Sequence, residues 1–104
     1  MTTAITSKDR RYLRSLAQTL KPVVVVGKLG LTDALAGAVD RALNEHELIK
    51  VKFNDFKDDK ETLVRELEER TGCAVCTIIG HVAVLYRPHP EEEKRRITLP
   101  GGGA

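Results

Sequence analysis

A short run of valines, Val23–Val26, constrains the fold of this chain more than any other feature. Proline precedes the run and Gly27 follows it, so it predicts one short strand between two breaks. β-Branched residues without interleaved polar ones are typical of a strand buried on both faces, as in the middle of a parallel sheet. The residues 27–30 then form a tight connection, and Thr32 is suited to cap a following helix. We therefore expect a strand, a turn and a helix in direct succession.

Three segments carry apolar residues at helical spacing. The first begins at Ser7, a suitable N-cap, and ends before Pro22. The second follows Thr32, and the third begins at Asp58 or Asp59 and ends at Gly72. The first helix has an apolar stripe and a separate basic one, which are Leu13, Leu16, Ala17 and Leu20, and Arg11, Arg14, Gln18 and Lys21.

Three further strands follow from alternation and turn residues. In the strand 48–53, Lys50 and Lys52 point to the face opposite the apolar residues. The strands 73–79 and 82–86 flank Gly80-His81, which suits a two-residue hairpin. The predicted order is α-β-α-β-α-β-β, an α/β fold with a mixed four-stranded sheet packed with helices. Two β-α-β crossovers imply parallel neighbours, and residues 97–99 are a candidate for a short extra strand.

Length and composition fit one domain over residues 1–100, with a disordered tail at 101–104. The chain has 104 residues and no tryptophan, so its core must be mainly aliphatic. No apolar run approaches the ~20 residues that a membrane helix needs, and the N-terminus has no apolar signal region. We therefore expect a cytoplasmic protein, monomeric and without a membrane partner, whose two cysteines are reduced.

Charge is distributed unevenly along the chain. Residues 1–32 carry six basic residues and one acid, a net charge of +5, whereas residues 33–104 carry eleven basic residues and fourteen acids, a net charge of −3. A basic first third on a mildly acidic body indicates a polyanionic partner, although a solvated helix face would give the same pattern.

The loop Gly27-Lys28-Leu29-Gly30 supplies the most specific candidate site. Glycines let a backbone approach another chain closely, and the amides that begin the next helix favour phosphate. A loop of the form G-x-x-G can clamp a nucleic-acid backbone in this way, with Lys28 adding a charge-assisted contact. Leu29 would pack on the domain or against a sugar or base. A plain tight turn is the alternative, and neither the nucleotide-hydrolysing phosphate loop nor the dinucleotide fingerprint is present.

Several segments together resemble the CRM domain, the chloroplast RNA splicing and ribosome maturation domain, whose bacterial single-domain members form the YhbY family. The resemblance lies in residues 20–32, in 46–52 (His-Glu-Leu-Ile-Lys-Val-Lys), in 79–88 and in the basic segment 95–100. It extends from about Thr6 to Pro100. The chain departs from the family pattern at Cys73 and Cys76, in the acidic run 91–93 and in its glycine-rich end.

This resemblance implies a fold like the C-terminal domain of bacterial translation initiation factor three. It also implies a non-enzymatic protein, without cofactor or small-molecule substrate, that binds ribosomal RNA in precursors of the large subunit. The contacts would come from the loop 27–30 and from four flanking bases in and after the first helix, which are Arg10, Arg11, Arg14 and Lys21. Lys50 and Lys52 match strand lysines of the family, and a solvated sheet face explains them equally well. An adaptor that reaches the ribosome through a protein is the alternative function.

Cys73-Ala-Val-Cys76 forms a C-x-x-C motif, which raises a redox or metal function as a third hypothesis. In redox proteins the motif usually begins a helix, whereas here it begins a strand. Residues three apart on a strand face opposite sides, so the two sulfurs would not easily meet. A zinc site needs further ligands at suitable spacing, and His81 and His89 form no obvious pair. We therefore expect two ordinary packed thiols.

Overall fold

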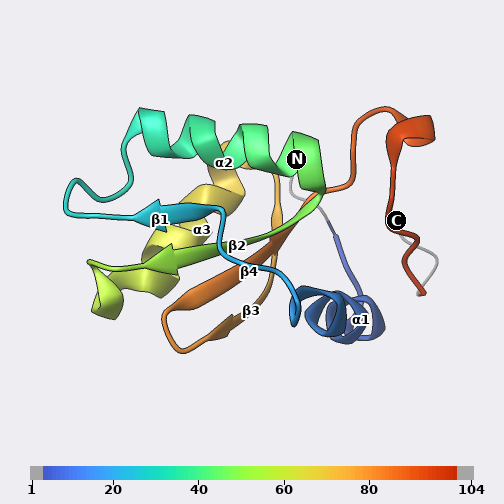
Figure 1. The fold of residues 1–104 in the computed structure, drawn as a ribbon, viewed down its shortest axis with the longest axis horizontal. Helices are drawn as coiled ribbons and strands as arrows, with labels where there is room; N and C mark the ends of the chain where they lie inside the picture. Colours follow the sequence, from blue (N-terminus) through green and yellow to red (C-terminus); the bar gives the residue numbers. More distant parts are fainter. Residues whose placement is uncertain (1–3, 101–104) are drawn as a thin grey trace.

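The computed structural model describes residues 4–100 as three helices, four strands and two short 3₁₀ turns (Figure 1). The predicted order α-β-α-β-α-β-β is confirmed. The predicted disordered tail, 101–104, lies outside the described residues, and the assignment of residues 1–100 to one domain stays a prediction. The elements are α1 (Ser7–Ala17), β1 (Val24–Val26), α2 (Asp33–His46), β2 (Leu48–Phe53), α3 (Lys60–Thr71), β3 (Ala74–Ile79) and β4 (Val82–Tyr86).

The four strands form one mixed sheet in the order β1-β2-β4-β3. β1 pairs with β2 in parallel, whereas β4 runs antiparallel to both β2 and β3. Only the first crossover therefore joins parallel neighbours, and the prediction of two such pairs is wrong for the second. The hairpin explains the difference, because β4 returns from β3 and occupies the position beside β2. β2 and β3 run in the same direction without touching.

β1 is an edge strand, which corrects the prediction that it is buried on both faces. Val24 and Val26 are buried, but Val25 between them is 47% exposed and Val23 is 51% exposed. β-Branched residues favour strands in general, since they fit a pleated, half-buried surface. A valine run therefore indicates a strand but does not by itself indicate two covered faces.

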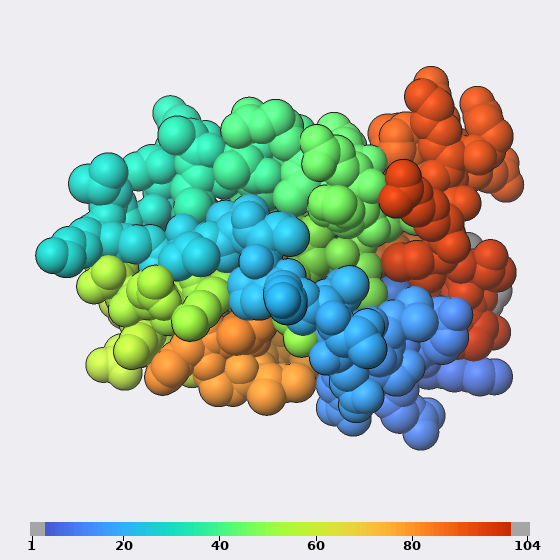
Figure 2. All heavy atoms as spheres, in the orientation of Figure 1, coloured from blue at the N-terminus to red at the C-terminus, as the bar shows by residue number. Residues whose placement is uncertain are grey.

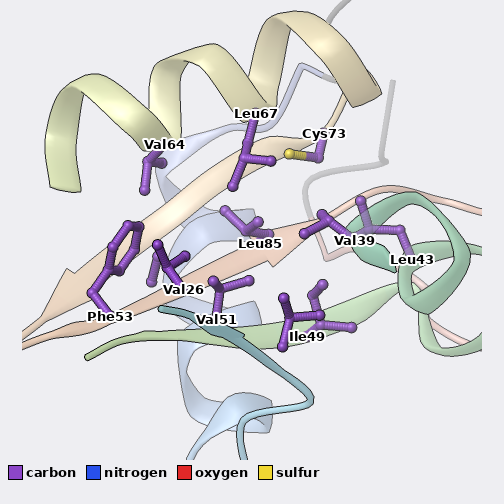
Figure 3. Packing of buried hydrophobic residues seen from close by; sticks show 12 residues of the cluster. Val26, Val39, Leu43, Ile49, Val51, Phe53, Val64, Leu67, Cys73 and Leu85 are labelled. Carbon is purple, nitrogen blue, oxygen red and sulfur yellow. The ribbon is translucent and has the colours of Figure 1, made fainter. Parts of the chain in front are cut away.

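The sheet separates two hydrophobic clusters. On the inner face, α2 and α3 cover side chains such as Val51, Phe53 and Leu85 (Figure 3). On the opposite face, here called the outer face, α1 contributes Leu13 and Ala17 to the second cluster. α1 covers only one part of the outer face (Figure 1). The uncovered part includes Val25, the two strand lysines and the hairpin residues Ile79 and Val82, which are exposed or half-buried.

Local signals fix the helix ends. The N-cap of α1 is Thr6 and not the predicted Ser7, because Thr6 and Asp9 form a reciprocal capping box. The hydroxyl of Thr32 caps α2, as predicted, by accepting from the Leu35 amide at 3.0 Å. Gly72 ends α3 in the left-handed conformation, also as predicted. α2 ends instead at Glu47, a non-glycine residue with a φ of 63°.

Two charged side chains anchor the C-terminal segment. The Glu47 carboxylate is buried and accepts backbone N–H groups of His89, Arg96 and Ile97 at 2.9, 2.6 and 3.2 Å. Arg87 binds the Asp40 carboxylate at 2.7 Å and the Thr71 carbonyl at 2.6 Å. Residues 97–99 form no strand, so that expectation is wrong. They lie instead against α1, where Ile97 and Leu99 extend the second cluster.

Candidate nucleic-acid interface

The loop 27–30 is a closed turn in which the two glycines have different roles. The Gly30 amide donates to the Gly27 carbonyl at 3.0 Å. Gly30 has a φ of 70°, and a Cβ added to it would lie 3.2 Å from the ring of Phe56. Gly27 needs no left-handed conformation, and nothing lies within 4 Å of its missing Cβ. Gly30 therefore shapes the turn, and Gly27 leaves open space in front of it.

The tip of this loop faces solvent. Leu29 is 87% exposed, so it does not pack back on the domain, one of the two placements expected for it. Lys28 beside it is exposed as well. The acid nearest along the chain, Asp33, pairs with Arg70 at 3.2 Å. The loop thus presents a lysine, an apolar side chain and an open glycine at the amino end of α2.

α1 presents a cluster of arginines on its solvent side. Arg10, Arg11 and Arg14 line one shallow recess of about 460 Å³ together with Ser7. The only acid of this helix, Asp9, is 1% exposed and accepts the Thr6 amide at 3.0 Å. The capping box therefore keeps the carboxylate of Asp9 inside, and the exposed side of the helix is basic.

Lys50 and Lys52 lie on the outer face of the sheet, as the alternation predicted. Lys52 is beside Val25 in the register of β1 and β2, and the Lys50 carbonyl accepts the Val23 amide at 3.1 Å. The outer-face positions of the four strands include no acidic residue. The two lysines therefore stand in an apolar and basic surface.

The predicted contact residues do not converge on one point. The loop projects at one end of the long axis, and α1 lies toward the other end (Figure 1). The outer face of β1 and β2 connects them, because β1 leads from Lys21 to the loop and runs parallel to β2. We call this arrangement the basic track; its members, from the loop to the helix, are Lys28, Lys52, Lys50, Lys21, Arg14, Arg11 and Arg10.

The two cysteines lie on opposite faces of the sheet, as predicted. Cys73 packs in the inner cluster beside Leu67 (Figure 3), and Cys76 packs under α1. Both are free and buried. Burial raises the pKa of Cys73 and raises that of Cys76 to about 12, so neither thiol is activated as a nucleophile. Within residues 4–100, no group of three or more His, Cys, Asp or Glu side chains is arranged to hold a metal ion.

Sequence reasoning missed Glu47 and Arg87, the two residues that hold the C-terminal segment in place. Their partners lie 42 to 50 residues away for Glu47 and 16 to 47 residues away for Arg87. No local pattern signals a buried acid of this kind. The only available hint was that Glu47 and Arg87 fall inside two of the segments that carry the family resemblance.

Comparison with known proteins identifies the family. The family model described as the CRS1 / YhbY (CRM) domain matches residues 5–87. A Haemophilus influenzae protein named "RNA-binding protein" is 38% identical over 99 residues, which cover 94% of this chain and 97% of that protein. A Pseudomonas aeruginosa protein, named a probable RNA-binding protein, is 37% identical and is matched over 88% of each chain.

A solved structure agrees with the fold. It is the solution structure of a hypothetical protein from Staphylococcus aureus, for which RNA binding is the suggested role. That protein is 37% identical to this chain, superimposes with a TM-score of 0.76, and is matched over 93% of this chain and 100% of its own length. No helix within the described residues is both long and apolar enough to cross a bilayer. The chain belongs to the CRS1/YhbY (CRM) domain family.

Proposed function

We propose that this protein binds RNA along the basic track and does so on ribosomal RNA in precursors of the large subunit. The observation that carries the proposal is the succession of basic side chains from Lys28 in the loop, over the outer face of β1 and β2, to the α1 arginines, all of them exposed except the half-buried Lys50. Its relatives are named as RNA-binding proteins. The ribosomal target comes from the family resemblance.

Phosphate contacts would supply most of the affinity, since lysine and arginine neutralise the RNA backbone and release counterions. The open space at Gly27 lets a phosphate approach the loop backbone, where Lys28 adds its charge. The α1 recess offers three guanidinium groups to a second region of the backbone. Base edges are not required for this mode of binding.

We further propose that the role is binding and not catalysis, in a cytoplasmic monomer. The side chains of the track are lysines and arginines, and both thiols are buried. The hydroxyl residue that lines the α1 recess, Ser7, shares it with three arginines and with no side chain that could act as a general base.

Gradient co-sedimentation with ribosomal particles tests the proposal. We expect the wild-type protein to travel with large-subunit precursors and Lys28→Glu to remain at the top of the gradient. Arg65→Glu is the matched control, because Arg65 is exposed on α3, which covers the opposite face of the sheet. It makes the same change in charge and should sediment like the wild type.

RNA digestion separates this function from the adaptor alternative. If association survives complete nuclease treatment through a purified ribosomal protein, the adaptor function replaces RNA binding. If the wild-type protein never leaves the top of the gradient, the large-subunit target is wrong.

A further inference from the structure

A groove of about 450 Å³ lies where α1, the residues before β1 and the C-terminal segment meet. Its walls include Leu16 and Leu20, two members of the apolar stripe predicted for the first helix. Both are more than one-third exposed, and Val23 beside them is half exposed. Figure 2 shows the red C-terminal segment beside the green end of α2 and the blue residues of α1. The groove is therefore an apolar surface that the chain itself leaves open.

The charged residues that line the groove are basic. Lys21, His46 and Arg96 line it, and none of its lining residues is acidic. Of the nearest acids along the chain, Glu45 is exposed beside the rim, 3.7 Å from the His46 ring, and Glu47 points into the amides of the C-terminal segment. An apolar floor with a cationic rim suits a ligand that combines a flat apolar body with negative charge.

One wall of the groove is held by the buried carboxylate of Glu47. Its Oε1 accepts the amides of Arg96 and Ile97, the two C-terminal residues that line the groove. This contact fixes the backbone that carries the Arg96 guanidinium. Glu47 is thus a positioning residue for the groove and does not itself line it.

We propose that the groove receives one unpaired nucleobase of the bound RNA. The inference rests on the proposed function, because Lys21 belongs both to the basic track and to the rim of the groove. RNA that follows the track would pass this opening with its phosphates near Lys21. The base would lie on the aliphatic side chains, with the planar groups of His46 and Arg96 available for stacking. The volume falls in the usual range of small-ligand pockets, ~300–1,000 Å³.

Methyl and amide NMR tests the proposal with two synthetic RNAs. One is a fully paired hairpin stem, and the other is the same stem with a single unpaired adenosine. We expect both RNAs to shift the amides of Lys28 and Lys52. Only the RNA with the unpaired base should shift the methyl groups of Leu16, Leu20 and Ile97.

The outcomes separate the two proposals. Both RNAs could shift the amides of the basic track while neither shifts the methyl groups of the groove. That result would overturn the groove proposal and leave the proposal of RNA binding intact. If neither RNA shifts any signal, both proposals are wrong. If a purified large-subunit protein moves the groove methyls and the unpaired base does not, the groove is a protein-docking site instead.

A variant pair adds an affinity measurement. Leu20→Ser should weaken binding of the RNA with the unpaired base by roughly tenfold, the effect of losing one base contact, and should leave binding of the paired stem unchanged. Ile79→Ser is the control, since Ile79 is exposed on the outer face but does not line the groove; it should leave the ratio of the two RNA affinities unchanged. Equal losses for both RNAs in Leu20→Ser would contradict a base-specific groove.

Discussion

At the scale of single residues, the two glycines of the loop should respond differently to substitution. Gly30 has a φ of 70° and faces the Phe56 ring, so Gly30→Ala should lower the free energy of unfolding by about 1 kcal/mol or more. Gly27→Ala should change it by less than about 0.5 kcal/mol, because its Cβ meets open space. Urea denaturation measures both. Equal destabilisation by the two variants would contradict the geometry of the turn.

The same contrast makes Gly27 the better position for testing RNA contact. A carboxylate introduced by Gly27→Asp would occupy the space assigned to a phosphate without straining the backbone. Gly30→Asp would also disrupt the turn, so a loss of binding in that variant would have two possible causes. We expect Gly27→Asp to weaken binding to a paired RNA stem by about tenfold, in proportion to one lost phosphate contact, and Gly27→Ala to bind like the wild type.

Glu47 should contribute more to stability than any exposed acid. Its carboxylate accepts three backbone amides, and Glu47→Ala would leave these donors without that partner. The expected loss in the free energy of unfolding is about 2–4 kcal/mol, measured by urea denaturation. Glu45→Ala is the control, because Glu45 is exposed and its carboxylate lies 3.7 Å from the exposed His46 ring. A loss below about 0.5 kcal/mol in Glu47→Ala would mean that the C-terminal segment is not anchored in this way.

At the scale of elements, the docking of α1 on the sheet should affect how the free energy of unfolding depends on pH above about 9. Burial raises the pKa of Cys76 from its ordinary 9.0 to about 12, and burial likewise raises the pKa of Tyr86 to about 12. Both lie in the cluster beneath α1. Above about pH 9 the unfolded chain loses the thiol proton while the folded chain keeps it. The free energy of unfolding should therefore be intact below that pH and fall as the pH rises toward 12.

The variant Cys76→Ala measures how much the Cys76 thiol contributes to this pH dependence. It should make the alkaline slope shallower by at most about 1.4 kcal/mol per pH unit, in urea titrations with a reducing agent present. Tyr86→Phe should remove the contribution of the Tyr86 hydroxyl to the pH dependence and leave that of Cys76 in place. An unchanged slope in Cys76→Ala would show that α1 does not shield this thiol from water.

The elements themselves could be predicted from local chemistry, but their neighbours could not. Thr32 and Gly72 fix helix ends through contacts within a few residues, and the alternation in β2 assigns Lys50 and Lys52 to one face. The edge position of β1 depends on where the distant hairpin inserts. Likewise, an apolar stripe shows which side of a helix avoids water in general, and not whether another segment covers it, which is why Leu16 of that stripe is 36% exposed.

At the scale of the whole molecule, the candidate site is an extended surface and not a pocket. The sequence therefore predicts which residues belong to it but not how they are arranged. The residues of the basic track are visible in the sequence as basic residues and a glycine loop. Their order across the outer face follows from the parallel pairing of β1 and β2 and from the internal capping contact that keeps Asp9 off the surface. The longest dimension of the molecule is 38 Å, so one RNA stem can reach from the loop to α1.

This arrangement predicts how binding depends on salt. If one RNA stem of about 16 base pairs contacts the whole track, the logarithm of the association constant should fall against the logarithm of salt concentration with a slope of about −4 or steeper. Lys28→Ala and Arg14→Ala, at opposite ends of the track, should each flatten the slope by about one, and the double variant by about two. Arg65→Ala, on the other side of the sheet, should leave it unchanged. A double variant no flatter than either single one would mean that the loop and α1 do not engage the same RNA, and the track would then be two independent basic surfaces.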